Sequence, residues 1–137
     1  MVDAAMIESM IGTPYDPQNH NCWHYVRDVQ QRLYGRDLPA IDLEQVNCRT
    51  VFEAFAADHP ERANWVEVAK PVDGAIVMMA RRDRTAHAGV YVALDEGLIL
   101  HCDDKHGVAA ERPLELRLRC WGKLRYYVPV ASESLLS

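Results

Sequence analysis

The stretch TPYDPQNHNCWHYVRDVQQRL, residues 13–33, contains the transition that organises the rest of the chain. It is irregular and interrupted by prolines up to Asn21, and an amphipathic pattern follows. Apolar residues then recur at helical spacing, at Val26, Val29 and Leu33. Asn21 is a favourable N-cap, so Cys22 is predicted to lie in the first turn of a helix. The unpaired N–H groups and the helix dipole stabilise a thiolate there, which makes Cys22 a candidate nucleophile.

Length and composition fit a single globular domain over residues 1–137. The net charge of −5 comes without a basic stripe, which argues against a nucleic-acid partner. No apolar run approaches the ~20 residues that span a bilayer. The first ten residues lack the basic and apolar regions of a signal peptide. We therefore expect synthesis in the cytoplasm, with any action outside it depending on a separate delivery machine.

Helical patterns come first along the chain and strand patterns second. We expect helices from Asp3 to Met10 and from Cys22 to near Gly35, and a third at the capping-box pattern Thr50-x-x-Glu53. Strand-like segments follow at 65–68, 75–79, 87–94, 98–102, 114–118 and 125–130. This order predicts an α+β domain, with N-terminal helices packed on a central antiparallel sheet of about five strands. Residues 132–137 are expected to form a loose tail.

A nucleophilic cysteine needs a base, and the hairpin predicted around Asp95–Gly97 offers two histidines. His87 opens one strand and His101 lies on its partner. Pairing residues whose numbers sum to about 192 places His101 opposite Tyr91, so one sheet face can hold both imidazoles. A thiolate, an imidazole and an orienting polar group could then form a chain. The plainer alternative makes each histidine a half-buried strand residue that bonds to the backbone.

Several short motifs occur in a consistent order over about residues 10–108. They are GTPY (12–15), NCWHYV (21–26), YGRDLP (34–39), DGAIVMM (73–79), HAGVYVA (87–93) and LILHC (98–102). Together they resemble the NlpC/P60 cysteine peptidases, papain-like enzymes that cut bacterial cell-wall peptides. The resemblance implies a papain-like fold and a thiol-dependent hydrolase that needs neither metal nor cofactor.

Matched position by position, the resemblance implies four catalytic roles. Cys22 is the nucleophile, His87 the base, His101 the residue that orients the base, and Tyr15 a hydroxyl donor to the oxyanion. The thiolate would attack an amide carbonyl, His87 would protonate the leaving amine, and water would clear the thioester. The usual substrate of the family is the peptidoglycan stem peptide, often at the bond between D-glutamate and diaminopimelate.

The nucleophile motif departs from the family pattern, because NCWH stands where the family has DCSG. The Cys-Trp pair and the ending LRYYVPV (124–130) resemble a compact phage-tail branch of the family. That branch implies delivery to the cell wall or periplasm by a tail or by a related secretion machine. Tail proteins, secretion-machine proteins and a cognate inhibitor are then candidate partners. Candidate substrate contacts are Trp23, His24, His20 and Asp103.

Three alternatives stay open. His20, Cys22 and His24, with His101, Cys102 and His106, offer soft ligands for zinc, although their spacing matches no common zinc motif. A structural or tail-assembly protein could retain the same fold without activity. A related amidase or acyltransferase would use the same cysteine and histidine on a different amide or ester.

Overall fold

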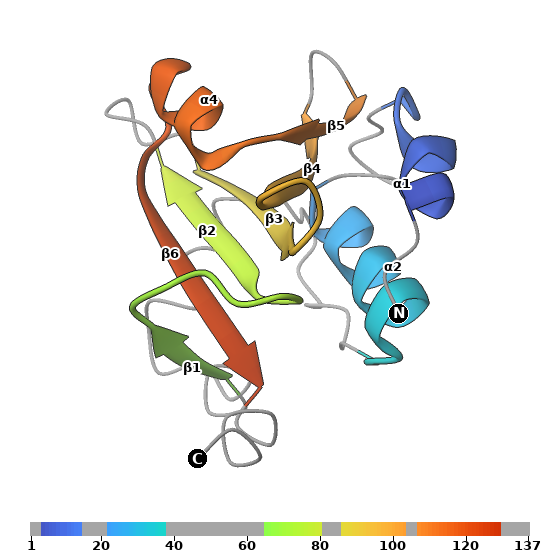
Figure 1. The fold of residues 1–137 in the computed structure, drawn as a ribbon, viewed down its shortest axis with the longest axis horizontal. Coiled ribbons are helices and arrows are strands. Elements are labelled where there is room, and N and C mark those ends of the chain that lie inside the picture. The colour runs from blue at the N-terminus through green and yellow to red at the C-terminus, as the bar shows by residue number, and fades with distance from the viewer. Residues whose placement is uncertain (1–3, 15–21, 38–64, 81–85, 104–106, 130–137) are drawn as a thin grey trace, which may run out of the picture.

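The computed structural model describes residues 4–14, 22–37, 65–80, 86–103 and 107–129. Two helices, α1 (Ala4–Met10) and α2 (Cys22–Tyr34), precede the strands. The sheet contains β1 (Trp65–Val68), β2 (Ile76–Ala80), β3 (Ala86–Val92), β4 (Leu98–Asp103), β5 (Gly107–Glu111) and β6 (Gly122–Pro129), and helix α4 (Pro113–Leu118) lies between the last two (Figure 1). The described part of the chain is therefore α+β, as predicted. The expected helix near Thr50 and the tail at 132–137 lie outside these residues.

The six strands form one antiparallel sheet in the order β1-β6-β2-β3-β4-β5. The sequence predicts β1 to β4 and β6 within a few residues of their observed bounds. Strand β5 was not predicted. Among the described helices, none is long and apolar enough to cross a bilayer.

The predicted strand at residues 114–118 is wrong, because this segment forms helix α4. Pro113 begins the helix, where its fixed φ and missing N–H favour a helical start. The Glu115 side chain accepts a hydrogen bond of 3.0 Å from the backbone N–H of Arg112. Of the three leucines that suggested alternation, only Leu116 is buried, and Leu114 and Leu118 are exposed. The local capping interactions decide the conformation, and one apolar contact anchors the helix.

Each face of the sheet packs against its own group of apolar residues. On one face, Ala88, Val90 and Val92 of β3 meet the buried side of α2, formed by Tyr25, Val26, Val29 and Leu33. The other face carries Val77, Met79 and Ile99, which pack with Leu116 of α4 and with Trp121. Helices α2 and α4 therefore cover opposite faces. The helical spacing that defined α2 in the sequence is confirmed, since Val26, Val29 and Leu33 are all buried.

The direction of α2 along the sheet follows from contacts near its two ends. Towards its C-terminus, Gln30 donates a 2.9 Å hydrogen bond to the carbonyl of Gly74, whose N–H bonds to Tyr91 near the end of β3. Nearer its N-terminus, Tyr25 packs in the same cluster as Cys102. Cys102 comes directly after His101, which is paired with Gly89, so Cys102 lies beside the first half of β3. Helix α2 thus runs along β3 in the same direction. Its first residue, Cys22, lies at the end of the sheet where β3 begins.

The turn between β3 and β4 determines which residues face each other. Gly97 donates to the carbonyl of Leu94 at 2.8 Å across a turn in which Asp95 and Glu96 both have positive φ, as hairpin turns of the primed type require. The predicted hairpin is confirmed, but its register is not. Paired residues sum to 190, so His101 lies opposite Gly89 and not Tyr91. Ala93 is an extra residue on the β3 side of the turn.

Residues 12 and 13, which follow α1, are attached to the outer edge of β5. The N–H of Gly12 donates to the carbonyl of Val108 at 3.0 Å, and the N–H of Val108 donates to the carbonyl of Thr13 at 2.9 Å. Gly107 permits this approach, because it has φ +70° and a Cβ there would overlap the carbonyl oxygen of Thr13. Gly12 and Thr13 are therefore tied to the edge of the sheet that β5 forms.

We predict that the buried hydroxyl of Tyr25 makes the folded protein less stable at alkaline pH. Burial, with smaller contributions from Cys102 and Asp28, raises the pKa of its hydroxyl well above the usual range. Above the ordinary tyrosine pKa of about 10, the unfolded chain loses this proton and the folded chain keeps it, so stability falls by up to about 1.4 kcal/mol per pH unit. Urea unfolding between pH 8 and 11 should show the loss, and Tyr25→Phe should reduce its slope. Equal slopes for the two proteins would contradict this assignment.

Candidate active site

Two histidines meet on the face of the sheet that packs against α4. His87 is the second residue of β3, and His101 lies on β4 opposite Gly89, so both side chains project to the same face. The Nε2 atom of His87 is 2.9 Å from the Nδ1 atom of His101. Both residues are buried, with exposed fractions of 5% and 0%. The structure therefore brings together the two imidazoles that the sequence placed on one hairpin face.

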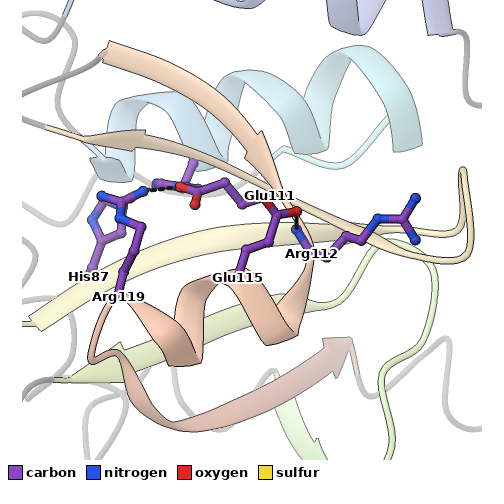
Figure 2. A network of polar contacts seen from close by, with 6 residues as sticks. His87, Glu111, Arg112, Glu115 and Arg119 are labelled. Carbon is purple, nitrogen blue, oxygen red and sulfur yellow. Dashed lines mark hydrogen bonds and ion pairs between the residues drawn. The ribbon is translucent and has the colours of Figure 1, made fainter.

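Two further residues, which the sequence reasoning missed, extend this pair. The Nε2 atom of His101 lies 2.9 Å from Oε1 of Glu111 on β5, and the same carboxylate oxygen accepts a hydrogen bond from Arg119, directly after α4. Figure 2 shows this network lying between the strands and α4. Glu111 was missed because β5 was not predicted. A glycine six residues after His101, at the start of another strand, was the signal that could have revealed it.

The order of these groups fixes the position of each proton. The Glu111 carboxylate only accepts hydrogen bonds, so Nε2 of His101 carries a hydrogen and its Nδ1 accepts when the ring is neutral. Nε2 of His87 must then carry the hydrogen between the two rings. This leaves Nδ1 of His87 as the nitrogen with a basic lone pair. Within these hydrogen bonds, Nδ1 of His87 is therefore the imidazole nitrogen that keeps its lone pair when both rings are neutral.

Trp121 covers one side of the base. Its ring stacks on that of His87, with centroids 5.2 Å apart and planes inclined by 23°. Trp121 is itself buried directly before β6, among the residues that pack with Leu116 of α4. The indole restricts rotation of the His87 ring and keeps water from that side of the histidine pair.

The helix that begins with the candidate nucleophile Cys22, α2, packs on the other face of the sheet. Helix α2 begins at Cys22, as predicted, so the cysteine has the helix-start position that favours a thiolate. The described residues of α2 pack on the face opposite to the histidines, and Figure 2 shows α2 beyond the strands that carry the network. Cys22 and His87 nevertheless share the same end of the sheet. The described part of α2 and the two histidines therefore lie on opposite faces at this end of the sheet.

The remaining predicted site residues are distributed unevenly. His24 lines an open groove of about 410 Å³ between α1, α2 and β5. The groove is also lined by Ser9, Met10, Thr13, Tyr25, Asp28, Arg32 and Val108. Tyr15 and His20 lie outside the described residues. Trp23 belongs to α2 and Asp103 ends β4, but the described part of the structure does not include their side chains.

Among the side chains that the structure describes, no three histidine, cysteine or acidic residues are grouped as a metal site. The zinc alternative depends partly on His20, Cys22 and His106, whose side chains lie outside that set. Cys102 is buried and Cys120 is exposed, and neither forms a disulfide. No protein-family model matches the chain, and no curated protein matches it in sequence. The likeness to NlpC/P60 peptidases therefore rests on the motifs alone.

Proposed function

We propose that the protein is a cysteine endopeptidase of the NlpC/P60 type, with a papain-like fold, that hydrolyses amide bonds in peptidoglycan stem peptides. The observation that carries the proposal is the buried chain from His87 through His101 to Glu111, with His87 at the end of the sheet where α2 begins with Cys22. Such a chain holds a base in one tautomer. The ordered motifs from GTPY to LILHC supply the substrate class.

In the proposed reaction, Nδ1 of His87 takes the thiol proton of Cys22, and the thiolate attacks the carbonyl carbon of the amide. The oxyanion accepts hydrogen bonds from the Cys22 N–H at the helix start and from the Tyr15 hydroxyl. As the C–N bond breaks, the imidazolium gives its proton to the leaving amine. Water, deprotonated by His87, then attacks the thioester and releases the acid and the Cys22 thiol.

The preferred bond in this proposal is that between D-glutamate and diaminopimelate. Trp23, His20 and Asp103 are proposed to contact the peptide near the nucleophile, and His24 to contact it from the groove between α1 and α2. Delivery to the cell wall or periplasm would depend on a phage tail or a secretion machine. A cognate inhibitor would protect the producing cell before delivery.

Mass spectrometry of purified muropeptides tests the proposal directly. Reduced protein is incubated with a disaccharide tetrapeptide that contains diaminopimelate, and we expect two fragments whose masses sum to the substrate plus one water. Pretreatment with iodoacetamide should prevent their appearance. Intact substrate after long incubation with fully reduced protein, over a range of stem-peptide lengths, would contradict the proposal.

A second candidate is a structural protein, such as a tail-assembly component, that keeps the fold without catalysis. The observation in its favour is that His87 is 5% exposed and lies on the sheet face opposite to the packing side of α2. In this case the chain from His87 to Arg119 serves to attach α4 to the sheet. This structural candidate predicts that the Cys22 thiol titrates independently of His87. Alkylation rates of Cys22 measured against pH can detect this.

A further inference from the structure

We infer that Glu111 is a positioning residue for the histidine pair and that Arg119 holds Glu111 in that role. The inference rests on the proposed function and deepens it, because neither residue belongs to the motifs that suggested a peptidase. Glu111 does not touch the reacting atoms. It acts through His101, which acts on His87.

The geometry of β5 explains how Glu111 reaches His101. In the sheet His101 is paired with Ala109, and Glu111 stands two residues further along β5, on the same face. Its carboxylate therefore approaches the imidazole diagonally, at 2.9 Å from Nε2. Glu111 is largely buried, with a side-chain exposure of 12%, and His101 is fully buried. A carboxylate in such a place needs strong donors to remain charged.

Arg119 supplies one of those donors. Its guanidinium bonds to the same Oε1 atom that meets His101, and its own side chain is 33% exposed. Because arginine can only donate hydrogen bonds, it keeps Glu111 an acceptor. It also balances the charge of the carboxylate while both histidines are neutral. When His87 takes up a proton, its positive charge is added to a network whose Glu111 and Arg119 charges cancel. The Glu111 carboxylate then lies on the far side of the His101 ring from this new charge.

Without the carboxylate, nothing in this chain of bonds selects one tautomer of His101. With Nε2 of His101 as acceptor, its Nδ1–H would donate to His87 and place the His87 hydrogen on Nδ1. That arrangement blocks the nitrogen that the reaction uses. Glu111 therefore decides which nitrogen of His87 is basic.

The variants Glu111→Gln and Glu111→Leu separate orientation from charge. The glutamine oxygen can still accept from both His101 and Arg119, so the tautomers should stay as they are while the anion is lost. Imidazolium is then less stable, and the midpoint of Cys22 alkylation should move to higher pH. Leucine removes the acceptor as well, and we expect mixed tautomers and a fall in kcat of about a hundredfold at unchanged KM.

Imidazole ¹⁵N NMR reads the tautomers in the resting protein without substrate, and Glu115→Gln is the matched control. Glu115 is also a carboxylate that accepts a hydrogen bond, but it lies within α4, and its bond of 3.0 Å to the backbone N–H of Arg112 caps that helix. Its replacement should leave both the tautomers and the alkylation midpoint unchanged. Wild-type tautomers and an unshifted pH profile in folded Glu111→Leu would overturn the inference. Failure to cleave any muropeptide, with the NMR result as expected, would instead count against the proposed function.

Discussion

Replacing Cys22 with alanine is expected to lower muropeptide hydrolysis by at least about 10⁴-fold while leaving the fold intact. The proposed mechanism forms its thioester on this sulfur, so its removal abolishes the covalent intermediate. The fold should persist because Cys22 is the first residue of α2 and alanine is the best helix former. Rates are measured by mass spectrometry of the fragments, and far-UV circular dichroism reports the helix and sheet content.

Cys120 provides the matched control for this experiment. It is a free and exposed thiol that follows α4, outside the histidine network. Cys120→Ala should retain full activity, which would show that the loss in Cys22→Ala is specific to its position. If Cys22→Ala keeps a tenth or more of the wild-type rate, the nucleophile has been assigned wrongly.

The second large effect is expected for His87→Ala, with a fall in kcat of about 10³- to 10⁴-fold. This change removes the only nitrogen that the hydrogen-bond chain leaves with a basic lone pair. It also leaves the buried Nδ1 atom of His101 without its partner, at a cost of about 1–3 kcal/mol in folding stability. Activity should therefore be compared at a temperature at which urea unfolding shows the variant to be folded.

Met79→Leu is a suitable control, because Met79 is buried and lies opposite His87 in the pairing of β2 with β3. This volume-conserving change disturbs the same part of the sheet at a cost below about 1.5 kcal/mol and should leave the rate nearly unchanged. The alkylation of Cys22 against pH gives the deciding result. An identical profile in wild-type and His87→Ala protein would mean that the sulfur does not meet the imidazole, and the structural candidate would be favoured.

The parts of the fold that the sequence predicts are those whose apolar periodicity has a single explanation. Val26, Val29 and Leu33 can share a buried side only in a helix, and the hairpin at Asp95–Gly97 joins two apolar runs of strand length. Helix α4 was not predicted, because three leucines at alternate positions give the pattern that is typical of a strand. Pro113 and the local bond of Glu115 outweigh that pattern over so short a segment.

The sequence predicts that His87 and His101 lie together, but it does not predict which face of the sheet they share with which helix. Every residue of β2 from Ile76 to Met79 is buried, because helices cover both faces of the sheet. With apolar residues on both faces, alternation cannot tell which face receives α2. The sequence therefore pairs His87 with His101 but does not reveal that α2 packs behind them. Glu111 and Arg119 join the pair only through tertiary contacts of β5 and α4.

The attachment of residues 12 and 13 to β5 has a consequence for how copies of this protein meet one another. An edge strand offers N–H and C=O groups to which a strand of a second molecule can add, and this is a common route to aggregation. At Val108 both groups are already engaged within the same chain. Gly107, by admitting Thr13 so closely, thus also keeps the backbone groups of Val108 from pairing with a strand of a second molecule.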